Sequence, residues 1–401
     1  MNPRHGGMRA WLVLSLFIVA GTAFAENMVE QGEYLSRVGN CAGCHTAPGE
    51  AEFAGGRAIE SEYGTFYAPN ISPDPATGIG DWSADDFWGA LHQGERPDGS
   101  ALYPACPYPS YTKVRREDVD AIFAYLQSLP AHRNKTREHR LDFPFSIRSL
   151  IPTWQLLFFE PGAFEADEQR SAAWNRGAYL VNGLGHCNAC HTDRDAFGAT
   201  RADASAPGQP IRGWYAPSLH AADEAGLQEW SVEGAASLLR AGKSGDASMM
   251  GPMADIVFES LQYLSVKDAR AMATYLRSLP DRQVESPVHL IRLPERSVQT
   301  AMESGEPIYQ ARCSDCHGDA GEGSVAAPAL AGNRTVTASN PTNLAKIIRH
   351  GGFPPSTHDN PMPFGMPPFQ NLTDREVAAL ITYIRASWGN EAAPVSAANL
   401  R

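Results

Sequence analysis

The chain has 401 residues, enough for two to four domains of about 100–200 residues each. Hydrophobic residues make up 43% of it and charged residues 19%, a balance that excludes a mainly disordered chain. The net charge of −12 argues against a nucleic acid as partner, and the odd number of seven cysteines excludes a fully paired disulfide scaffold.

The first 25 residues have the features of a secretory signal peptide. Arg4 and Arg9 supply positive charge, the apolar run Ala10–Ala20 follows, and Ala23–Ala25 has the small residues of a cleavage site. The run is shorter than the roughly 20 residues of a membrane-spanning helix, so an N-terminal anchor is the less favoured alternative. We predict that residues 1–25 are removed and that the mature protein is exported.

Six of the seven cysteines lie in three copies of the pattern Cys-x-x-Cys-His. This composition gives roughly 0.004 chance matches, and the pattern is the attachment signal of c-type haem. Two thiols three positions apart can both bond to the haem vinyl groups, and the adjacent histidine then lies beneath the iron. A zinc site is disfavoured because the copies lie far apart in the chain. The attaching residues would be Cys41, Cys44, Cys187, Cys190, Cys313 and Cys316, and the proximal iron ligands His45, His191 and His317.

Each copy lies between two predicted helices. A short helix is expected before the cysteines, and a longer one follows in which apolar residues recur at three- and four-residue steps. The short helices contain Gly32, Gly177 and Gly305, and the longer ones cover Asp118–Leu129, Asp268–Leu279 and Glu376–Ser387. We therefore predict a mainly α protein of three tandem cytochrome c-type domains, each built around a covalently bound haem c. Their expected ranges are 26–170, 171–296 and 297–401.

An apolar segment follows the first of these units. Phe143–Phe159, which we call the apolar strip, is dense in large hydrophobic residues but also contains Pro144, Arg148 and Pro152. Two interpretations stay open. The strip either packs across two domains or forms an exposed docking surface for a partner subunit or a membrane.

Together these features resemble the tri-haem cytochrome c subunit of membrane-associated bacterial dehydrogenases that act on alcohols, gluconate, sorbitol, fructose or aldehydes. The resemblance runs from about Gly32 to Asn390 and includes Tyr67–Ser83, Leu102–Tyr111, the apolar strip and Met366–Phe369. It implies three haem c groups that take electrons from a catalytic dehydrogenase subunit. The electrons then pass either to quinone or to an electron-acceptor protein of a respiratory chain. The catalytic partner in such complexes carries a flavin, pyrroloquinoline quinone or molybdopterin.

The resemblance also implies a location and a mode of membrane attachment. It places the protein in the periplasm, with peripheral association at the outer face of the inner membrane as an open alternative. Members that bind membranes through this subunit often continue into a C-terminal amphipathic anchor. The Ala-rich polar tail after Trp388 departs from that pattern, so we expect no independent membrane binding.

Distal iron ligands are expected to be methionines in the second and third domains. The family position corresponds to Met253 in the second domain, with Met249 and Met250 as alternatives, and to Met366 in the third, with Met362 as alternative. In each case a methionine that only fills a core or a turn is the competing interpretation.

The first domain departs from the family. The chain has no methionine between Met28 and Met249, and Cys106 takes the position of the family's ligand. Three interpretations remain: a thiolate ligand that lowers the potential of the first haem, a non-ligating thiol, or an intermolecular disulfide. In the second of these, the iron is five-coordinate or bound by another group such as His92 or Lys113.

Two classes of function follow. The first is an electron-transfer subunit without catalytic residues of its own, because no dinucleotide, nucleophile-elbow or paired-carboxylate motif stands out. The alternative is a catalytic multihaem enzyme similar to thiosulfate dehydrogenases, which use a cysteine-ligated haem. A shuttle cytochrome without a fixed partner is a third option. We expect no catalytic activity from the chain alone.

Overall fold

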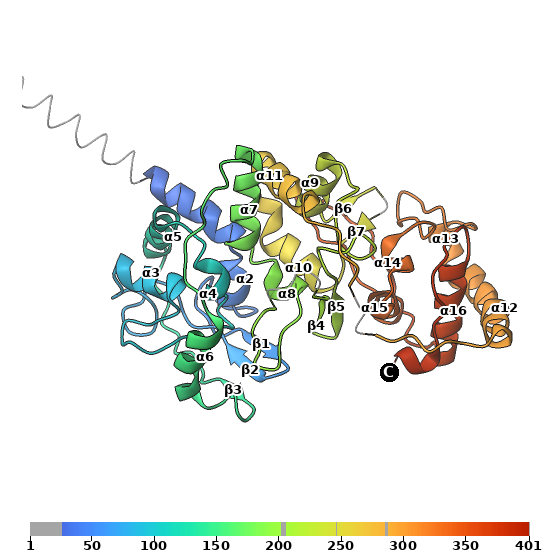
Figure 1. The fold of residues 1–401 in the computed structure, drawn as a ribbon, viewed down its shortest axis with the longest axis horizontal. Helices are drawn as coiled ribbons and strands as arrows, with labels where there is room; N and C mark the ends of the chain where they lie inside the picture. Colours follow the sequence, from blue (N-terminus) through green and yellow to red (C-terminus); the bar gives the residue numbers. More distant parts are fainter. Residues whose placement is uncertain (1–25, 202–205, 246, 285–287, 401) are drawn as a thin grey trace, which may run out of the picture. The chain divides into compact units, whose positions relative to one another are not determined.

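The computed structural model describes residues 26–201, 206–245, 247–284 and 288–400, and the predicted signal peptide lies outside them. The chain forms two compact units (Figure 1). Unit 1 contains the described residues up to Thr153 together with Glu160–Phe164. Unit 2 contains Trp154–Phe159 and the chain from Glu165 onward.

Unit 1 is built of helices and one small antiparallel sheet of strand order β1-β2-β3. Residues 26–38 are helical. The helices that follow are α2 (Cys41–His45), α3 (Ala84–His92), α4 (Tyr108–Tyr111) and α5 (Arg116–Ser128), then the 3₁₀ turn η1 (Arg148–Leu150) and α6 (Ile151–Phe158), whose last residues belong to unit 2. The strands are β1 (Ala58–Ser61), β2 (Gly64–Tyr67) and β3 (Arg140–Leu141).

Unit 2 contains the second and third Cys-x-x-Cys-His segments. Around the second are α7 (Ala172–Asn182), α8 (Asn188–His191), α9 (Val232–Ala241), α10 (Pro252–Glu259), η2 (Leu261–Tyr263) and α11 (Val266–Arg277), with hairpins β4 (Gln209–Ile211)–β5 (Trp214–Ala216) and β6 (Lys243–Ser244)–β7 (Ala247–Ser248). Around the third are α12 (Glu295–Arg312), α13 (Ser314–His317), α14 (Arg334–Thr337), α15 (Thr342–His350), α16 (Asp374–Ala386) and η3 (Ala397–Leu400).

The predicted mainly α fold is confirmed, and the three long closing helices appear as α5, α11 and α16. Side-chain caps explain where the last two begin. Ser265 accepts a hydrogen bond from the backbone of α11, and Thr373 with Glu376 forms a capping box on α16. Among the described residues, no helix combines the length and apolar character needed to cross a membrane.

A glycine marks the place where the first helix of each cytochrome-like segment crosses the closing helix. A Cβ atom at Gly32, Gly177 or Gly305 would collide with the backbone carbonyl of the closing helix. The carbonyls belong to Ala121, Ala271 and Ala379. The repeated glycines of the sequence are therefore points of close helix contact, where no larger residue fits.

Large apolar side chains surround these crossings. Buried side chains near the three crossings include Leu35, Ile122 and Leu126, then Tyr179, Leu180 and Met272, and then Tyr309, Leu380 and Ile381. The chain thus places a small helical core beside each Cys-x-x-Cys-His segment.

Candidate haem-attachment sites

Each Cys-x-x-Cys-His segment forms a short helical turn. The turns are α2, α8 and α13, and each ends at its histidine. A helical turn places residues three positions apart on the same side, so both cysteines of a pair can face one ligand. All seven cysteines lie within the described residues, and none of them forms a disulfide there.

The three histidines share one hydrogen-bond arrangement. Nδ1 of His45 lies 2.7 Å from the carbonyl oxygen of Pro69, and Nδ1 of His191 lies 2.7 Å from that of Pro217. Nδ1 of His317 lies 2.9 Å from the carbonyl oxygen of Pro328. A carbonyl oxygen only accepts, so Nδ1 carries the proton and donates. Nε2 is then left with the lone pair that binds a metal ion.

Burial shifts the pKa values of the three histidines and of cysteines in the same segments. Burial lowers the pKa of His45, His191 and His317, an effect that the proline carbonyls partly oppose, and so keeps the imidazoles neutral. Burial also raises the pKa of Cys41 and of Cys187 to about 12. Covalent haem c requires two thiols that bond to its vinyl groups and a neutral, oriented imidazole that binds its iron. The residues present fit this group.

Sequence reasoning missed the three proline carbonyls. Two of them lie in the repeated Tyr-Ala-Pro motif, at Pro69 and Pro217, so this repeat was the signal that could have found them. The third, Pro328, follows its histidine by 11 positions, whereas the separations in the other two pairs are 24 and 26. This unequal spacing hides the relation in the sequence.

Different side chains hold the first two proline loops. Asn70 donates from its amide to the carbonyl of His132 at 2.7 Å, and its Oδ1 accepts from the backbone of Ser72 at 2.9 Å. Near the second Cys-x-x-Cys-His segment, the buried carboxylate of Glu224 accepts from the backbone of Ser218 at 2.6 Å and from the hydroxyl of Tyr215 at 3.1 Å. Asn70 and Glu224 therefore orient the carbonyls that orient the histidines.

We expect the stability of the Glu224→Gln variant to depend on pH differently from that of wild type. Burial raises the pKa of Glu224 in the folded state, so the folded protein binds this proton more tightly than the unfolded chain. That contribution to stability is fully present below the ordinary carboxyl pKa and is lost as the pH rises through the folded-state pKa. The melting temperature of the variant relative to that of wild type should rise over the pH range above about 4, where an ordinary carboxyl group ionises, as circular dichroism would measure. A constant difference over this range would contradict the assignment.

Cys106 lies close to the first pair of attaching cysteines. Burial and the neighbouring Cys44 raise the pKa of Cys106 to about 12, and Cys106 in turn contributes to the raised pKa of Cys41. Tyr111, whose hydroxyl donates to the carbonyl of Gly39 at 2.9 Å, has its pKa raised by burial and by the same three thiols. The fold thus brings Cys106 to the first attachment segment, and coordination of iron by Cys106 stays a prediction.

His92, one of the alternative ligands named for the first haem, takes part in other contacts. The ring of His92 stacks on Trp88 with centroids 4.3 Å apart, and its Nδ1 lies 3.4 Å from the Thr112 hydroxyl. These contacts tie His92 to the packing around α3 and α4.

The two methionines that match the family positions lie in segments with defined structure. Met253 is in the first turn of α10. Met366 exchanges backbone hydrogen bonds of 2.8 and 3.0 Å with Gly352 and packs against the hydrophobic core that includes Tyr309 and Leu380. Met362 is 86% exposed, which favours Met366 over it. Ligation by Met253 and Met366 stays a prediction.

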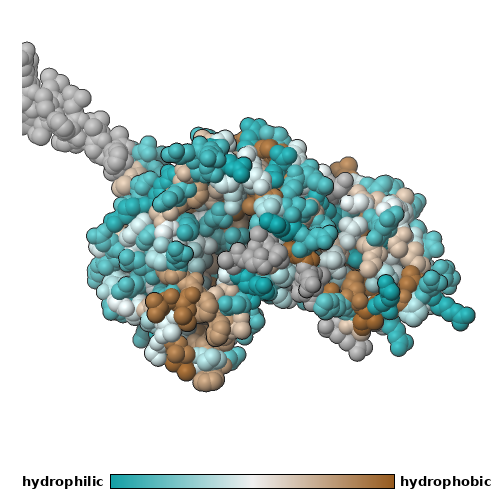
Figure 2. Space-filling view, viewed as in Figure 1, coloured by the Kyte–Doolittle hydropathy of each residue, from teal (hydrophilic) through white to brown (hydrophobic). Residues whose placement is uncertain are grey.

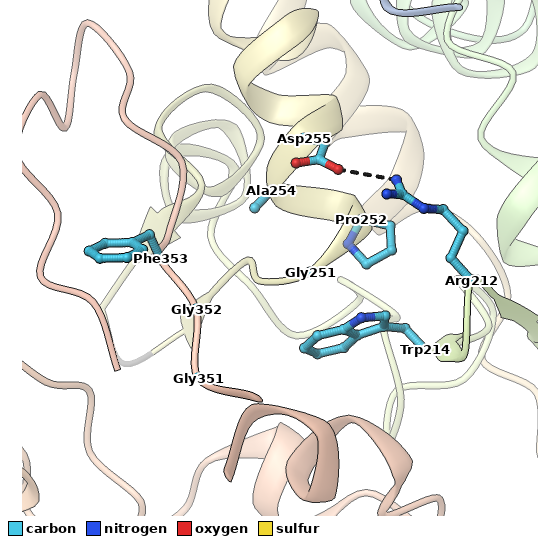
Figure 3. Close-up of a pocket in the computed structure, with 9 residues that line it drawn as sticks. All are labelled: Arg212, Trp214, Gly251, Pro252, Ala254, Asp255, Gly351, Gly352 and Phe353. Carbon is cyan, nitrogen blue, oxygen red and sulfur yellow. Dashed lines mark hydrogen bonds and ion pairs between the residues drawn. The ribbon is translucent and has the colours of Figure 1, made fainter. Parts of the chain in front are cut away.

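A cavity of about 310 Å³ in unit 2 borders both methionine-bearing segments (Figure 3). Its lining includes Gly251, Pro252 and Ala254, which are neighbours of Met253 in the chain. It also includes Gly351, Gly352 and Phe353, of which Gly352 is the backbone partner of Met366. Trp214 lies on one side, and Arg212 and Asp255 pair at 3.2 Å above it. The lining contains no residue of a Cys-x-x-Cys-His segment, so the cavity is not itself an attachment site.

Reciprocal hydrogen bonds join the second and third cytochrome-like segments within unit 2. The side-chain oxygen of Asn343 on α15 accepts from the backbone N–H of Tyr215 at 2.9 Å, and its amide donates to the Tyr215 carbonyl at 2.7 Å. An ion pair between Arg240 and Asp359 at 3.2 Å adds to this contact. The strand that leads to Pro217 is therefore fastened directly to the third segment.

This fold and these donor sets define a c-type cytochrome. The cytochrome c family profile matches residues 29–130 and 302–388. The chain is 36% identical to the cytochrome c subunit of a quinone alcohol dehydrogenase from Komagataeibacter europaeus, over 94% of this chain and 85% of the relative. It is 35% identical to the gluconate 2-dehydrogenase cytochrome c subunit of Pantoea cypripedii (96% and 92%) and 36% identical to the fructose dehydrogenase cytochrome subunit of Gluconobacter japonicus (92% and 81%).

The chain therefore belongs to the family of cytochrome c subunits of dehydrogenases, and it binds haem c covalently. The resemblance inferred from its motifs is confirmed.

Proposed function

We propose that the protein is a three-haem electron-transfer subunit. It takes electrons from the catalytic subunit of a dehydrogenase and passes them to quinone or a downstream respiratory acceptor at the periplasmic side. The observation that carries the proposal is the threefold recurrence of a histidine whose Nδ1 is held by a proline carbonyl and which directly follows a pair of cysteines that form no disulfide. The three domains would cover residues 26–170, 171–296 and 297–401.

The roles of the residues follow from their chemistry. Haem c, when bound, supplies an iron that gains and loses a single electron. The cysteine pairs fix the group covalently, and the three histidines bind the iron through Nε2 because Nδ1 is committed to a carbonyl. Cys106, Met253 and Met366 would supply the second iron ligand of the three groups.

The catalytic partner is proposed from the relatives. They are cytochrome subunits of alcohol, gluconate and fructose dehydrogenases, and a further relative is a subunit of the nicotinate dehydrogenase of Pseudomonas putida. We propose a partner of this kind, with a flavin, pyrroloquinoline quinone or molybdopterin as its cofactor. Substrate specificity then resides in the partner, because this chain contributes no catalytic residue to the proposal.

Haem content tests the three-haem assignment. The chain is produced with a c-type haem maturation system, and the ratio of haem to protein is measured from the pyridine haemochrome spectrum. We expect a ratio of three for wild type and of two when Cys187 and Cys190 are both replaced by alanine. A wild-type ratio below three would overturn the assignment.

An assay with reductants separates the two function classes. The purified chain alone is mixed with thiosulfate or alcohols, and haem reduction is followed in the visible spectrum. We expect no turnover until the dehydrogenase subunit and its substrate are added. Turnover by the chain alone would favour the catalytic alternative.

A further inference from the structure

Unit 2 has two features that the proposed function does not use. One is the end of the apolar strip, where Leu156 and Leu157 are 84% and 67% exposed. Figure 2 shows hydrophobic side chains gathered where Figure 1 draws α6. The strip is therefore exposed at this end, but exposure by itself identifies no partner. The other feature is the contact between the second and third cytochrome-like segments, and this contact leads to a proposed redox site.

Asn343 of the third segment binds the backbone of the second. Its side-chain oxygen accepts from the N–H of Tyr215 at 2.9 Å, and its amide donates to the carbonyl of the same residue at 2.7 Å. Tyr215 is the central residue of β5, which pairs with β4 in a sheet of two strands. A side-chain amide that bonds both backbone groups of one residue takes the place of a neighbouring strand. Asn343 therefore holds β5 at the edge that β4 leaves free.

This edge leads directly to the carbonyl that orients His191. Pro217 follows the last residue of β5, and its carbonyl oxygen lies 2.7 Å from Nδ1 of His191. Only one residue separates Tyr215 from Pro217, and the proline ring fixes one of the two soft backbone dihedrals of Pro217. A displacement of β5 is therefore passed on to the hydrogen bond of His191.

Other contacts hold the same hairpin from within the second segment. The side-chain amide of Gln209 on β4 donates to the carbonyls of Ala189 and Thr192, on either side of the attaching turn, at 2.8 and 2.9 Å. The Tyr215 hydroxyl donates to Glu224 at 3.1 Å. Asn343 differs from Gln209 and Glu224 because it comes from the segment around the third Cys-x-x-Cys-His motif.

The two segments also touch at places away from β5. Arg240 pairs with Asp359 at 3.2 Å, and the guanidinium of Arg334 lies 5.7 Å over the ring of Trp230. These contacts remain when Asn343 is replaced. The effect of Asn343 on His191 can therefore be separated from a general loss of contact between the segments.

We propose that Asn343 is a positioning residue for the second haem, supplied by the third cytochrome-like segment. It holds β5, and through β5 the carbonyl of Pro217, where Nδ1 of His191 donates its proton. That hydrogen bond makes the imidazole more basic, and a more basic ligand stabilises ferric iron. The third segment thus helps to set the reduction potential at the second site. This inference rests on the proposed function and adds a residue that couples two of its redox sites.

Potentiometric titration of the haem-loaded Asn343→Leu variant tests the proposal. Leucine has the branched shape of asparagine but makes neither hydrogen bond to Tyr215. The transition of the second haem is identified as the one that disappears when Cys187 and Cys190 are both replaced by alanine. We expect this transition to lie at a higher potential in Asn343→Leu than in wild type, because a less firmly held carbonyl weakens the hydrogen bond from His191. The low-spin electron paramagnetic resonance signal of the same haem should change as well.

The matched control is the same substitution at Asn399, a half-buried asparagine of unit 2 that also binds backbone groups. Its amide donates to the carbonyl of His289 at 3.2 Å, and its oxygen accepts from the N–H of Ile291 at 3.4 Å. Asn399→Leu should leave the transition and the signal of the second haem as they are in wild type. A lower melting temperature shared by both variants would reflect stability alone.

A second variant, Asn343→Ser, keeps a polar group at the position and is available if Asn343→Leu does not fold. It should raise the same potential, because a serine hydroxyl is too short to replace both bonds to Tyr215. An unchanged or lowered potential in the Asn343 variants, or an equal rise in Asn399→Leu, would overturn the proposal. A wild-type titration without any transition that depends on Cys187 and Cys190 would instead overturn the three-haem function.

Discussion

The Cys106→Met variant is expected to have a first haem whose reduction potential is higher than in wild type by a substantial part of the roughly 0.8 V that axial ligands span. A thiolate carries negative charge and is a soft donor, so it stabilises ferric iron, whereas a neutral thioether favours the ferrous state more. Cys106 already lies near Cys44 of the first attachment segment. Potentiometric titration should show one redox transition moving and the others unchanged.

The buried environment makes this prediction more specific. Because burial raises the pKa of Cys106 to about 12, the thiol stays protonated in the absence of a positive charge. Only a metal ion at the site would favour the thiolate. The low-spin electron paramagnetic resonance signal of the oxidised first haem should therefore differ between wild type and the variant.

A surface control completes this experiment. Val325 is 91% exposed, so Val325→Cys introduces a thiol that should leave all potentials and signals as they are in wild type. Identical low-spin signals from wild type and Cys106→Met would contradict thiolate ligation. The interpretations with a non-ligating thiol or an intermolecular disulfide would then remain, and electrophoresis without reductant distinguishes these two.

Replacing Gly177 by alanine is expected to lower the free energy of unfolding by about 1–3 kcal/mol, the usual cost of overpacking a core. Intrinsic helix propensity alone favours alanine over glycine by about 1 kcal/mol. Here the new methyl group would collide with the carbonyl oxygen of Ala271, so α7 and α11 would have to move apart. Steric repulsion therefore outweighs propensity, and thermal unfolding should show a melting temperature several degrees lower.

The matched control is Gly89→Ala on α3. Its nearest atoms are Oε1 of Gln93 at 3.8 Å and the carbonyl oxygen of Glu95 at 3.9 Å, which leaves room for a methyl group. This variant should be more stable than wild type by about 0.5–1 kcal/mol. Equal stability changes for the two alanine variants would show that the crossing at Gly177 is not tightly packed.

The attachment sites and the long helices could be predicted from the sequence because both are local. Covalent haem attachment needs two thiols and a histidine within one turn of chain, so Cys41–His45 carries its chemistry in five consecutive residues. The amphipathic periodicity of Glu376–Ser387 likewise lies within one segment, and α16 covers Asp374–Ala386. The glycines Gly32, Gly177 and Gly305 could also be seen to recur in the sequence, but the helix crossings that require them could not.

The remaining features depend on contacts between residues far apart in the chain. The carbonyl of Pro69 reaches His45 across 24 positions, whereas that of Pro328 reaches His317 across only 11, so no fixed spacing reveals the relation. The approach of Cys106 to Cys44 depends on how the loop before α4 folds back within unit 1. The apolar strip could be read as buried or exposed, because composition alone does not say which side chains are covered.

The sequence by itself therefore determined the haem chemistry, the helical class and the family of this protein, since each depends on residues that are neighbours in the chain. Only the tertiary structure decided which carbonyl holds each histidine, why a glycine stands at each helix crossing and which apolar side chains face solvent. These are properties of packing, and packing joins residues whose separation in the sequence has no constant value.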